Sequence, residues 1–172
     1  MARWFRGVDV RSQGSGNIGA TNVARVAGKK LGVLVLVLDA LKGALPVVAA
    51  LRLLPGEARV GAAVGLAAFL GHVFPVWLRL KGGKGVATAL GVLGVLVPWA
   101  ALAGAGVYVA LFIAFRVSSV GSLFGGLATV VAAFWVYGPG EPAALSAVLL
   151  VLMVGTHRAN IRRLVQRSEK RL

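Results

Sequence analysis

The stretch that decides the fold is VATALGVLGVLVPWAALAGAGVYVALFIAF, residues 86–115. It is continuously apolar, and as a single helix it would be about 45 Å long, whereas the hydrocarbon core of a bilayer is about 30 Å thick. Pro98 lies near its middle, where a proline breaks or kinks a helix. The stretch is therefore compatible with one kinked membrane span or with two short antiparallel spans.

Four further apolar runs surround this stretch, separated by turn signals rich in glycine and proline. With 58% hydrophobic residues, 14% charged residues and a mean hydropathy of +0.85, the chain lies well outside the range of soluble domains. We expect one integral membrane domain over residues 1–172 and no separate soluble domain. The runs are 31–54, 60–78, 117–138 and 142–156.

The distribution of basic residues favours two spans over one in 86–115. Two spans give six passes, so that both termini share a side. That side then holds six basic residues in 1–30, four in the intervening loops and six in 158–172, against Arg52 and Arg59 on the other. Five passes would leave the basic C-terminal tail outside, against the positive-inside rule. We therefore predict an all-α polytopic bundle of about six transmembrane helices, with the third and fourth short and both termini cytoplasmic.

Charge and composition also exclude several classes of protein. The chain has 19 Lys and Arg against 5 Asp and Glu, but most of these charges flank apolar runs, which favours membrane topology over nucleic-acid binding. The lack of cysteine excludes disulfides, thiolate metal sites and Cys nucleophiles. Two histidines and few carboxylates argue against a metal centre. Residues 1–28 lack the long apolar core of a cleavable signal peptide.

The first polar motif is GSGNIGATNVAR at 14–25. It matches the dinucleotide fingerprint GxGxxG, but that fingerprint requires a βαβ unit and a membrane span follows here. Glycines let a backbone approach an anion closely, and nearby hydroxyl, amide and guanidinium groups add donors. The alternative is a polar loop that caps the first span. The candidate anion-binding residues are Ser15, Gly16, Asn17, Thr21, Asn22 and Arg25.

The second motif combines GHVFP at 71–75 with KGGKGVAT at 81–88. A basic glycine loop here opens into a helix N-terminus, where free N–H groups, the helix dipole and Lys84 favour an anion. It is not a Walker A loop, because Gly85 stands where Ser or Thr is required. The alternative is a positive-inside anchor loop. For His72, inside a span, we favour hydrogen bonding between helices over contact with substrate.

The third motif is HRANIRRL at 157–164, where the last span ends. On a helix His157, Asn160 and Ile161 share one face, which we expect to be turned to the bundle. We expect the basic residues Arg162, Arg163, Arg167, Lys170 and Arg171 to anchor the protein to anionic lipids. Within the first span, Asp39 and Lys42 are expected to form a structural ion pair, with a role near the site as the minor alternative.

Together these motifs resemble the acyl-phosphate:glycerol-3-phosphate acyltransferase family (PlsY) of bacterial membranes. The matching segments are SGNIGATNVAR at 15–25, GHVFP and KGGKGVAT within 71–88, HRANIRRL at 157–164, and DALKG at 39–43. The resemblance covers essentially the whole chain. It implies a bundle of short membrane helices that transfers an acyl group from acyl phosphate to the 1-hydroxyl of sn-glycerol 3-phosphate. The products are lysophosphatidic acid and phosphate, in the first acylation of phospholipid biosynthesis.

The resemblance also implies site residues, partners and location. His157, Asn160 and Asn22 resemble residues that position substrate or support acyl transfer. The resemblance implies a site facing the cytoplasm in the bacterial inner membrane, no cofactor or metal, and no direct use of an acyl-enzyme, acyl carrier protein or coenzyme A. The implied phosphate-binding set is Ser15, Gly16, Asn17, Thr21, Arg25, Gly82, Gly83, Lys84, Gly85 and Thr88, with possible support from Lys81, His72, Asp39 and Lys42.

The chemistry of an acyl phosphate suits these residues. A mixed anhydride has a good leaving group, so that orientation and charge stabilisation do much of the work. His157 as general base and substrate-assisted proton transfer to a phosphate are both consistent with the sequence. No base is evident near Ser15, which argues against it as a nucleophile.

One feature departs from the family. Family members usually have a hydrophobic span before the first motif, whereas Met1 stands only 14 residues before Ser15. We expect either a misassigned or truncated start, or six spans where seven are usual. The alternative function is a membrane transporter of anions or phosphate compounds. A transporter should show internal repeats and broken helices, and only the short pair around Pro98 suggests this.

Overall fold

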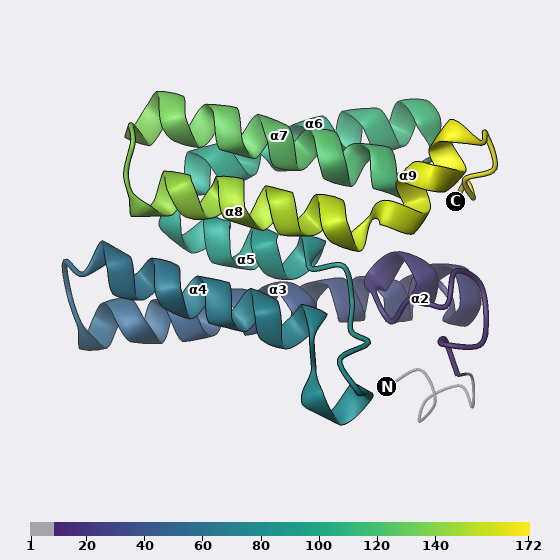
Figure 1. Cartoon of the computed structure of the whole chain (residues 1–172), viewed down its shortest axis with the longest axis horizontal. Coiled ribbons are helices and arrows are strands. Elements are labelled where there is room, and N and C mark those ends of the chain that lie inside the picture. The colour runs from purple at the N-terminus through teal and green to yellow at the C-terminus, as the bar shows by residue number, and fades with distance from the viewer. Residues whose placement is uncertain (1–8) are drawn as a thin grey trace.

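The computed structural model describes residues 9–172, and every regular element within them is helical (Figure 1). The expectation of an all-α membrane fold is confirmed. The elements are α2 (Ala20–Ala27), α3 (Lys29–Leu53), α4 (Ala58–Val73), the 3-10 turn η1 (Val76–Leu78), α5 (Val86–Leu96), α6 (Pro98–Phe115), α7 (Ser118–Tyr137), α8 (Glu141–Thr156) and α9 (Arg158–Val165).

Helices α3 to α8 run back and forth, so that each is antiparallel to the next (Figure 1). One end of the bundle, here called the motif end, carries 14–28, 74–85, 116–118 and 157–172. The other, the short-turn end, carries only 54–57, the α5–α6 break and 138–140. Three motifs far apart in sequence thus lie at the same end, as the even number of passes predicted.

Four helical segments are long and apolar enough to cross a membrane: 29–53, 58–78, 98–115 and 118–137. The count becomes five if α8 and α9, which meet at a bend of 62°, form one broken span. Helix α5 has 11 residues, so that it rises only about 16 Å. The third helix is thus short, as predicted, whereas the fourth, α6, has 18 residues and reaches spanning length.

The decisive stretch 86–115 forms two helices. Helix α5 ends at Leu96 and α6 begins at Pro98, with Val97 between them. The Val97 N–H still donates to the Leu93 carbonyl at 2.8 Å, which completes α5. Pro98 occupies the first turn of α6, where its missing N–H removes no helical hydrogen bond. The proline therefore separates two helices instead of kinking one.

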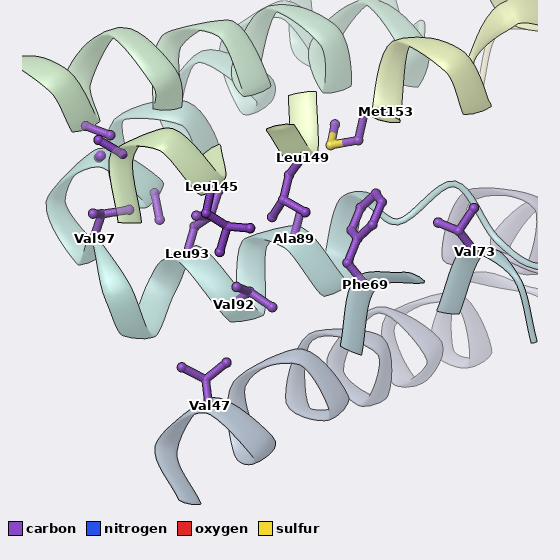
Figure 2. Packing of buried hydrophobic residues seen from close by; sticks show 14 residues of the cluster. Val47, Phe69, Val73, Ala89, Val92, Leu93, Val97, Leu145, Leu149 and Met153 are labelled. Carbon is purple, nitrogen blue, oxygen red and sulfur yellow. The ribbon is translucent and has the colours of Figure 1, made fainter. Parts of the chain in front are cut away.

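The core lies where α3, α4, α5 and α8 meet, and its large side chains are fully enclosed (Figure 2). Phe69 of α4 and Leu149 of α8 approach each other across α5, and Val92 fills the space toward α3. Large apolar side chains on the outer surface are exposed, among them Trp99 and Trp135. An apolar outer surface of this kind is suited to contact with lipid. The core fixes the relative positions of α3, α4, α5 and α8, and so of the loops that these helices carry at the motif end.

Candidate functional site

A cavity of about 350 Å³ opens at the motif end and reaches between α5, α6, α7 and α8. Polar and basic side chains line its outer part. Its inner part is mainly apolar, and the hydroxyls of Ser122, Thr129 and Ser146 there donate to backbone carbonyls of α7 and α8. Polar residues of this wall include Ser15, Arg25, Lys84, Ser119, His157 and Asn160. Apolar residues include Leu93, Ala101, Ala105, Val109, Leu149 and Met153. A molecule with an anionic head and an apolar tail fits a cavity divided in this way.

Asn22 organises the first motif. Its Oδ1 accepts the Ser15 N–H at 2.8 Å, and its Nδ2 lies within 3.1 Å of the carbonyls of Val10, Gln13 and Asn17. The residue is 2% exposed and lies in the cavity wall. These hydrogen bonds show that Asn22 holds the loop that carries Ser15, while its expected part in catalysis stays a prediction.

Half of the first motif is helical instead of a loop. Residues 20–27 form α2, which ends at Gly28, a residue with φ of 99°. Val23 and Ala27 bury one face of α2 against α3, so that the opposite face is free to meet the cavity. Arg25 and Thr21 line the cavity, and the Thr21 hydroxyl lies 3.1 Å from that of Ser118.

Lys84 is held by the main chain at the start of α5. Its carbonyl accepts a hydrogen bond from the Thr156 hydroxyl at 3.0 Å, which ties the loop to the end of α8. Gly85 follows with φ of 84°, and a Cβ there would lie 2.1 Å from the Phe69 ring. Only glycine allows both this backbone conformation and this approach. The loop therefore delivers Lys84 to the cavity beside the α5 N-terminus.

Gly82 and Gly83 have a different role from the one expected. Their N–H groups donate to the carbonyls of Val73 and His72, at 3.0 and 3.2 Å, and are not available to an anion. A Cβ on Gly83 would lie 2.0 Å from the His72 ring. These glycines pack the loop against the end of α4, and only Lys84 and Gly85 of this loop line the cavity.

Burial lowers the pKa of Lys84 to about 8. Glu169 acts in the opposite direction, while Arg163 and Arg25 lower the value further. These effects show that four charged groups from four parts of the chain share one electrostatic environment. The N-termini of α2, α5 and α7 also line the cavity, so that their dipoles add positive potential.

His157 stands at the bend between α8 and α9 and is 1% exposed. Its Nδ1 lies 2.8 Å from the Met153 carbonyl. A carbonyl oxygen only accepts, so Nδ1 carries the hydrogen, and a neutral ring then has its lone pair on Nε2. His157 also lines the cavity, as the third motif predicted for this helix face.

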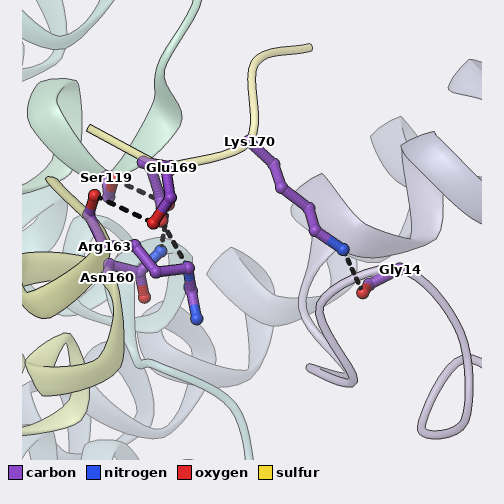
Figure 3. Close-up of polar contacts among 7 residues, drawn as sticks. Gly14, Ser119, Asn160, Arg163, Glu169 and Lys170 are labelled. Carbon is purple, nitrogen blue, oxygen red and sulfur yellow. Dashed lines mark hydrogen bonds and ion pairs between the residues drawn. The ribbon is translucent and has the colours of Figure 1, made fainter. Parts of the chain in front are cut away.

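A polar cluster closes the motif end around Glu169 (Figure 3). The carboxylate accepts hydrogen bonds from Ser119 at 3.1 Å, from Arg163 at 2.6 Å and from the Asn160 amide nitrogen. The Asn160 Oδ1 is buried and has no hydrogen-bond partner. Arg163 faces the cavity and Lys170 donates to the Gly14 carbonyl at 2.8 Å. Arg163 and Lys170 thus make contacts within the motif end, and the expectation that they anchor the protein to lipid stays a prediction.

Besides Gly82 and Gly83, four further expected residues lie outside the cavity wall: Gly16, Lys81, Thr88 and Lys42. Thr88 is fully buried where α5 packs on α3, and Lys81 is exposed to solvent. Lys42 pairs with Asp39 at 2.6 Å, which confirms the predicted ion pair, but its side chain points outward.

Asp39 and His72 border the cavity and face each other, with 3.7 Å between Oδ1 and Nδ1. This contact joins α4 to α3, but the His72 Nδ1 has no hydrogen-bond partner among the described residues, so the expected hydrogen bond between helices is not made by this atom.

A family model described as glycerol-3-phosphate acyltransferase matches residues 1–167. The chain belongs to the glycerol-3-phosphate acyltransferase family. It is 65% identical over 171 residues to the glycerol-3-phosphate acyltransferase of Myxococcus xanthus (strain DK1622), covering 99% of this chain and 89% of that one. The corresponding protein of Anaeromyxobacter dehalogenans (strain 2CP-1 / ATCC BAA-258) is 52% identical over 100% of this chain and 88% of its own.

Solved structures agree. The chain superimposes with a TM-score of 0.93 on PlsY (YgiH), an integral membrane glycerol 3-phosphate acyltransferase, in its glycerol 3-phosphate form. The two are 41% identical, and the match covers 98% of this chain and 84% of that one. The lysophosphatidic acid form gives a TM-score of 0.87 at 40% identity, covering 92% and 81%. Membership of an acyltransferase family confirms the expectation of an enzyme over the transporter alternative.

Within this family fold, the sequence alone did not point to Ser118, Ser119 or Glu169. The two serines begin α7 and resemble an ordinary helix start, and Glu169 is a lone acid in a basic tail. A signal did exist for the serines: they follow Arg116, so that a turn at the motif end places them beside the other motifs. Nothing in the sequence indicates that the tail folds back.

Proposed function

We propose that this protein transfers a fatty acyl group from acyl phosphate to the 1-hydroxyl of sn-glycerol 3-phosphate. The products are lysophosphatidic acid and inorganic phosphate, in the first acylation of phospholipid biosynthesis. The observation that carries this proposal is the divided cavity. Its outer part, here called the polar mouth, is lined by Ser15, Arg25, Lys84, Ser119, His157 and Asn160. Its inner part, here called the apolar arm, is lined by Leu93, Ala101, Ala105, Val109, Leu149 and Met153. The whole chain acts as one membrane domain.

The polar mouth is suited to the phosphates of both substrates. Arg25 and, below about pH 8, Lys84 supply positive charge, and Ser15 supplies a neutral donor from the loop that Asn22 holds. Arg25 has the planar fork that pairs with two phosphate oxygens, while Lys84 acts as a point charge. Three helix N-termini on the same wall strengthen the attraction.

The apolar arm is suited to the acyl chain. It is lined by side chains of α5, α6, α7 and α8. Such a lining replaces the contacts that an acyl chain makes in the bilayer, so that its methylenes stay out of water. The acyl carbonyl carbon then lies at the boundary between arm and mouth, close to His157 and Asn160.

The reaction requires no covalent enzyme intermediate. The 1-hydroxyl oxygen of glycerol 3-phosphate attacks the acyl carbonyl carbon to form a tetrahedral intermediate. The bond from that carbon to the phosphate oxygen then breaks, inorganic phosphate leaves, and the hydroxyl proton is transferred to it. Bound phosphate groups and fixed donors supply orientation and charge stabilisation.

The proton has two routes. His157 carries its hydrogen on Nδ1, so that a neutral ring presents the Nε2 lone pair as an acceptor. In the other route a phosphate oxygen takes the proton directly. His157→Gln keeps a polar group but removes the base. A loss of kcat of at least about a hundredfold supports the first route, and a loss below about tenfold supports the second.

The decisive assay uses purified protein in detergent or lipid, supplied with glycerol 3-phosphate and palmitoyl phosphate. We expect release of phosphate together with lysophosphatidic acid identified by mass spectrometry. Palmitoyl coenzyme A in place of palmitoyl phosphate should give no product. Phosphate release that does not depend on glycerol 3-phosphate would refute the acyltransferase proposal.

We further propose that the motif end faces the cytoplasm of a bacterial inner membrane, because basic loops are retained on that side. The chain has no cysteine, so single cysteines can report orientation. Lys81→Cys lies at the motif end and Glu57→Cys at the short-turn end, and both positions are exposed. A membrane-impermeant maleimide should label the Glu57 variant in intact cells and the Lys81 variant only after permeabilisation. The reverse pattern would overturn the orientation.

A further inference from the structure

The loop between α4 and α5 extends from the motif end of the bundle. The apolar segment 58–78 does not continue as one helix, because α4 stops at Val73 and η1 begins only after Pro75. Figure 1 shows the chain leaving α4 here, extending away from the other helices and returning to α5. Residues 74–81, here called the η1 loop, contribute no side chain to the cavity wall. Their role therefore lies outside the site described above.

The η1 loop combines exposed apolar side chains with basic ones. The exposed apolar residues are Phe74, Val76, Trp77 and Leu80, of which Trp77 is 81% exposed. Arg79 and Lys81 are exposed in the same loop. A group of large apolar side chains is unfavourable in water, whereas apolar and basic residues together suit the interface of an anionic membrane.

The backbone of the η1 loop is hydrogen-bonded within itself and to the end of α4. Every N–H group from Leu78 to Gly83 donates to a carbonyl of the segment 72–78, at 3.0 to 3.2 Å. Arg79 and Leu80 have φ of 52° and 61°, a left-handed conformation that reverses the chain so that these bonds form. An open loop would leave its N–H groups unsatisfied where water is scarce. These internal bonds therefore suit the loop to a membrane interface.

Two other described tryptophans lie at the opposite end of the bundle. Trp99 begins α6 and Trp135 lies near the end of α7, and they are 68% and 87% exposed. The backbone N–H of Trp99 donates to the Tyr137 hydroxyl at 3.1 Å, which joins the two helices there. Tryptophan and tyrosine gather at both interfaces of a membrane. Trp77 then belongs to the interface at the motif end, where the η1 loop carries it.

We propose that the η1 loop lies in the headgroup region of an anionic leaflet at the motif end and thereby fixes the depth of Lys84 in the membrane. Its apolar side chains contact lipid acyl chains, while Arg79 and Lys81 contact lipid phosphates. The loop continues through Gly82 and Gly83, which are bonded to α4, directly into Lys84. The contact with lipid does not depend on the function proposed above, whereas its effect on a membrane-bound acyl phosphate rests on that function.

The fluorescence of Trp77 measures this contact directly. Trp4→Phe, Trp99→Phe and Trp135→Phe together leave Trp77 as the only tryptophan of the chain. The protein is reconstituted in vesicles of phosphatidylcholine and phosphatidylglycerol whose acyl chains carry bromine near the headgroup. We expect these lipids to remove most of the Trp77 emission and aqueous iodide to remove little. The control is Gln13→Trp without the four native tryptophans, at an exposed position of the polar first loop, where iodide should quench and the lipids should not.

The two quenchers distinguish the alternative neighbours of Trp77. Quenching by iodide to the same extent as in the Gln13→Trp control would place the loop in water and overturn the proposal. Quenching by neither agent would also overturn it, because a protein surface such as a second copy of this chain would then cover the ring. If brominated lipid quenches Trp77 while the protein transfers no acyl group, the lipid contact stands and the proposed function fails.

The kinetic effect of the η1 loop should appear only in a bilayer. Arg79→Gln removes one basic residue from the interface and should raise the KM for palmitoyl phosphate about fivefold in vesicles that contain phosphatidylglycerol. In vesicles of phosphatidylcholine alone this variant should have the KM of the wild type. Trp77→Ser should raise the same KM in both kinds of vesicle but not in detergent micelles, with kcat preserved.

Trp135→Ser, at an exposed position of the short-turn end, is the matched control and should leave the KM for palmitoyl phosphate unchanged. An equal rise in KM in vesicles and in detergent would show that the η1 loop only supports the fold, and would overturn its role in setting the depth of Lys84. An unchanged KM in Trp77→Ser in every setting would overturn that role as well.

Discussion

Each end of the bundle contains an arginine–glutamate ion pair, and the two pairs differ in how far their side chains are exposed to solvent. Arg59 and Glu141 meet at 2.8 Å at the short-turn end, with side chains 84% and 42% exposed. Arg163 and Glu169 meet at 2.6 Å at the motif end, with side chains 32% and 9% exposed. The first pair is screened by water, whereas the second is enclosed with Lys84 and other donors. The same two residue types therefore form a surface ion pair where water surrounds them and part of a binding site where the protein encloses them.

The largest effect is expected from removal of the positive charge at the motif end. Lys84→Ala should lower kcat/KM by about a hundredfold or more, because a charged donor to phosphate is lost from an enclosed site. Arg25→Ala should behave similarly. The measurement is steady-state acylation of glycerol 3-phosphate, with circular dichroism to show that the helices persist. Wild-type kinetics in both variants would show that the phosphate site is wrongly placed.

The pH dependence of kcat/KM should report on Lys84 at the motif end. The ammonium of Lys84 loses its proton near pH 8, whereas an ordinary lysine keeps it to above pH 10. Because only the protonated form attracts phosphate, kcat/KM should be constant below about pH 8 and fall about tenfold per unit above it. Lys84→Arg should move this limb upward in pH, since the guanidinium stays charged. A limb that does not move would assign the titration to another group.

Glycine substitutions test packing at the two ends. Gly85 and Gly138 have φ of 84° and 73°, but a Cβ at Gly85 meets Phe69 at 2.1 Å while Gly138 has open space around it. Gly138→Ala should lower stability by about 1–3 kcal/mol through backbone strain alone, because φ of 73° with ψ of 180° is a conformation that essentially only glycine adopts. Gly85→Ala should lower it by a further 1–3 kcal/mol or so because the core must shift. Thermal unfolding in detergent measures the difference, and equal losses would contradict it.

The smallest effect is expected at the exposed pair. Glu141→Gln removes the charge that pairs with Arg59, both at the surface of the short-turn end. Activity should not change, because this end contributes nothing to the cavity wall among the described residues. The same assay that detects the loss in Lys84→Ala serves here. A substantial loss of kcat/KM would mean that the two ends are coupled.

Much of the helical framework is predictable from sequence, because apolar runs in a membrane have few alternatives to helix. Pro98 marked the break between α5 and α6, and the basic residues indicated which loops share an end. Lys84, Arg25 and His157 were predicted because their motifs are local. The positions of their side chains in one cavity follow from the same topology.

The remainder depends on contacts that no local pattern encodes. Asn22 was expected to act on substrate, and only its hydrogen bonds to four backbone groups show that it holds a loop. Gly82 and Gly83 were expected to bind an anion, but their N–H groups were already paired within the fold. Glu169 acquires its partners only when the tail reverses at Arg167, a residue with no turn signal.

The shortness of α5 has a consequence for where the chemistry takes place. At about 16 Å it traverses roughly half of a hydrocarbon core of about 30 Å, and its N-terminus carries Lys84 and Gly85. If the proposed reaction takes place at this level, glycerol 3-phosphate descends from water to meet an acyl chain held in the bilayer. The new lipid would then form at the depth where it resides and leave by lateral diffusion.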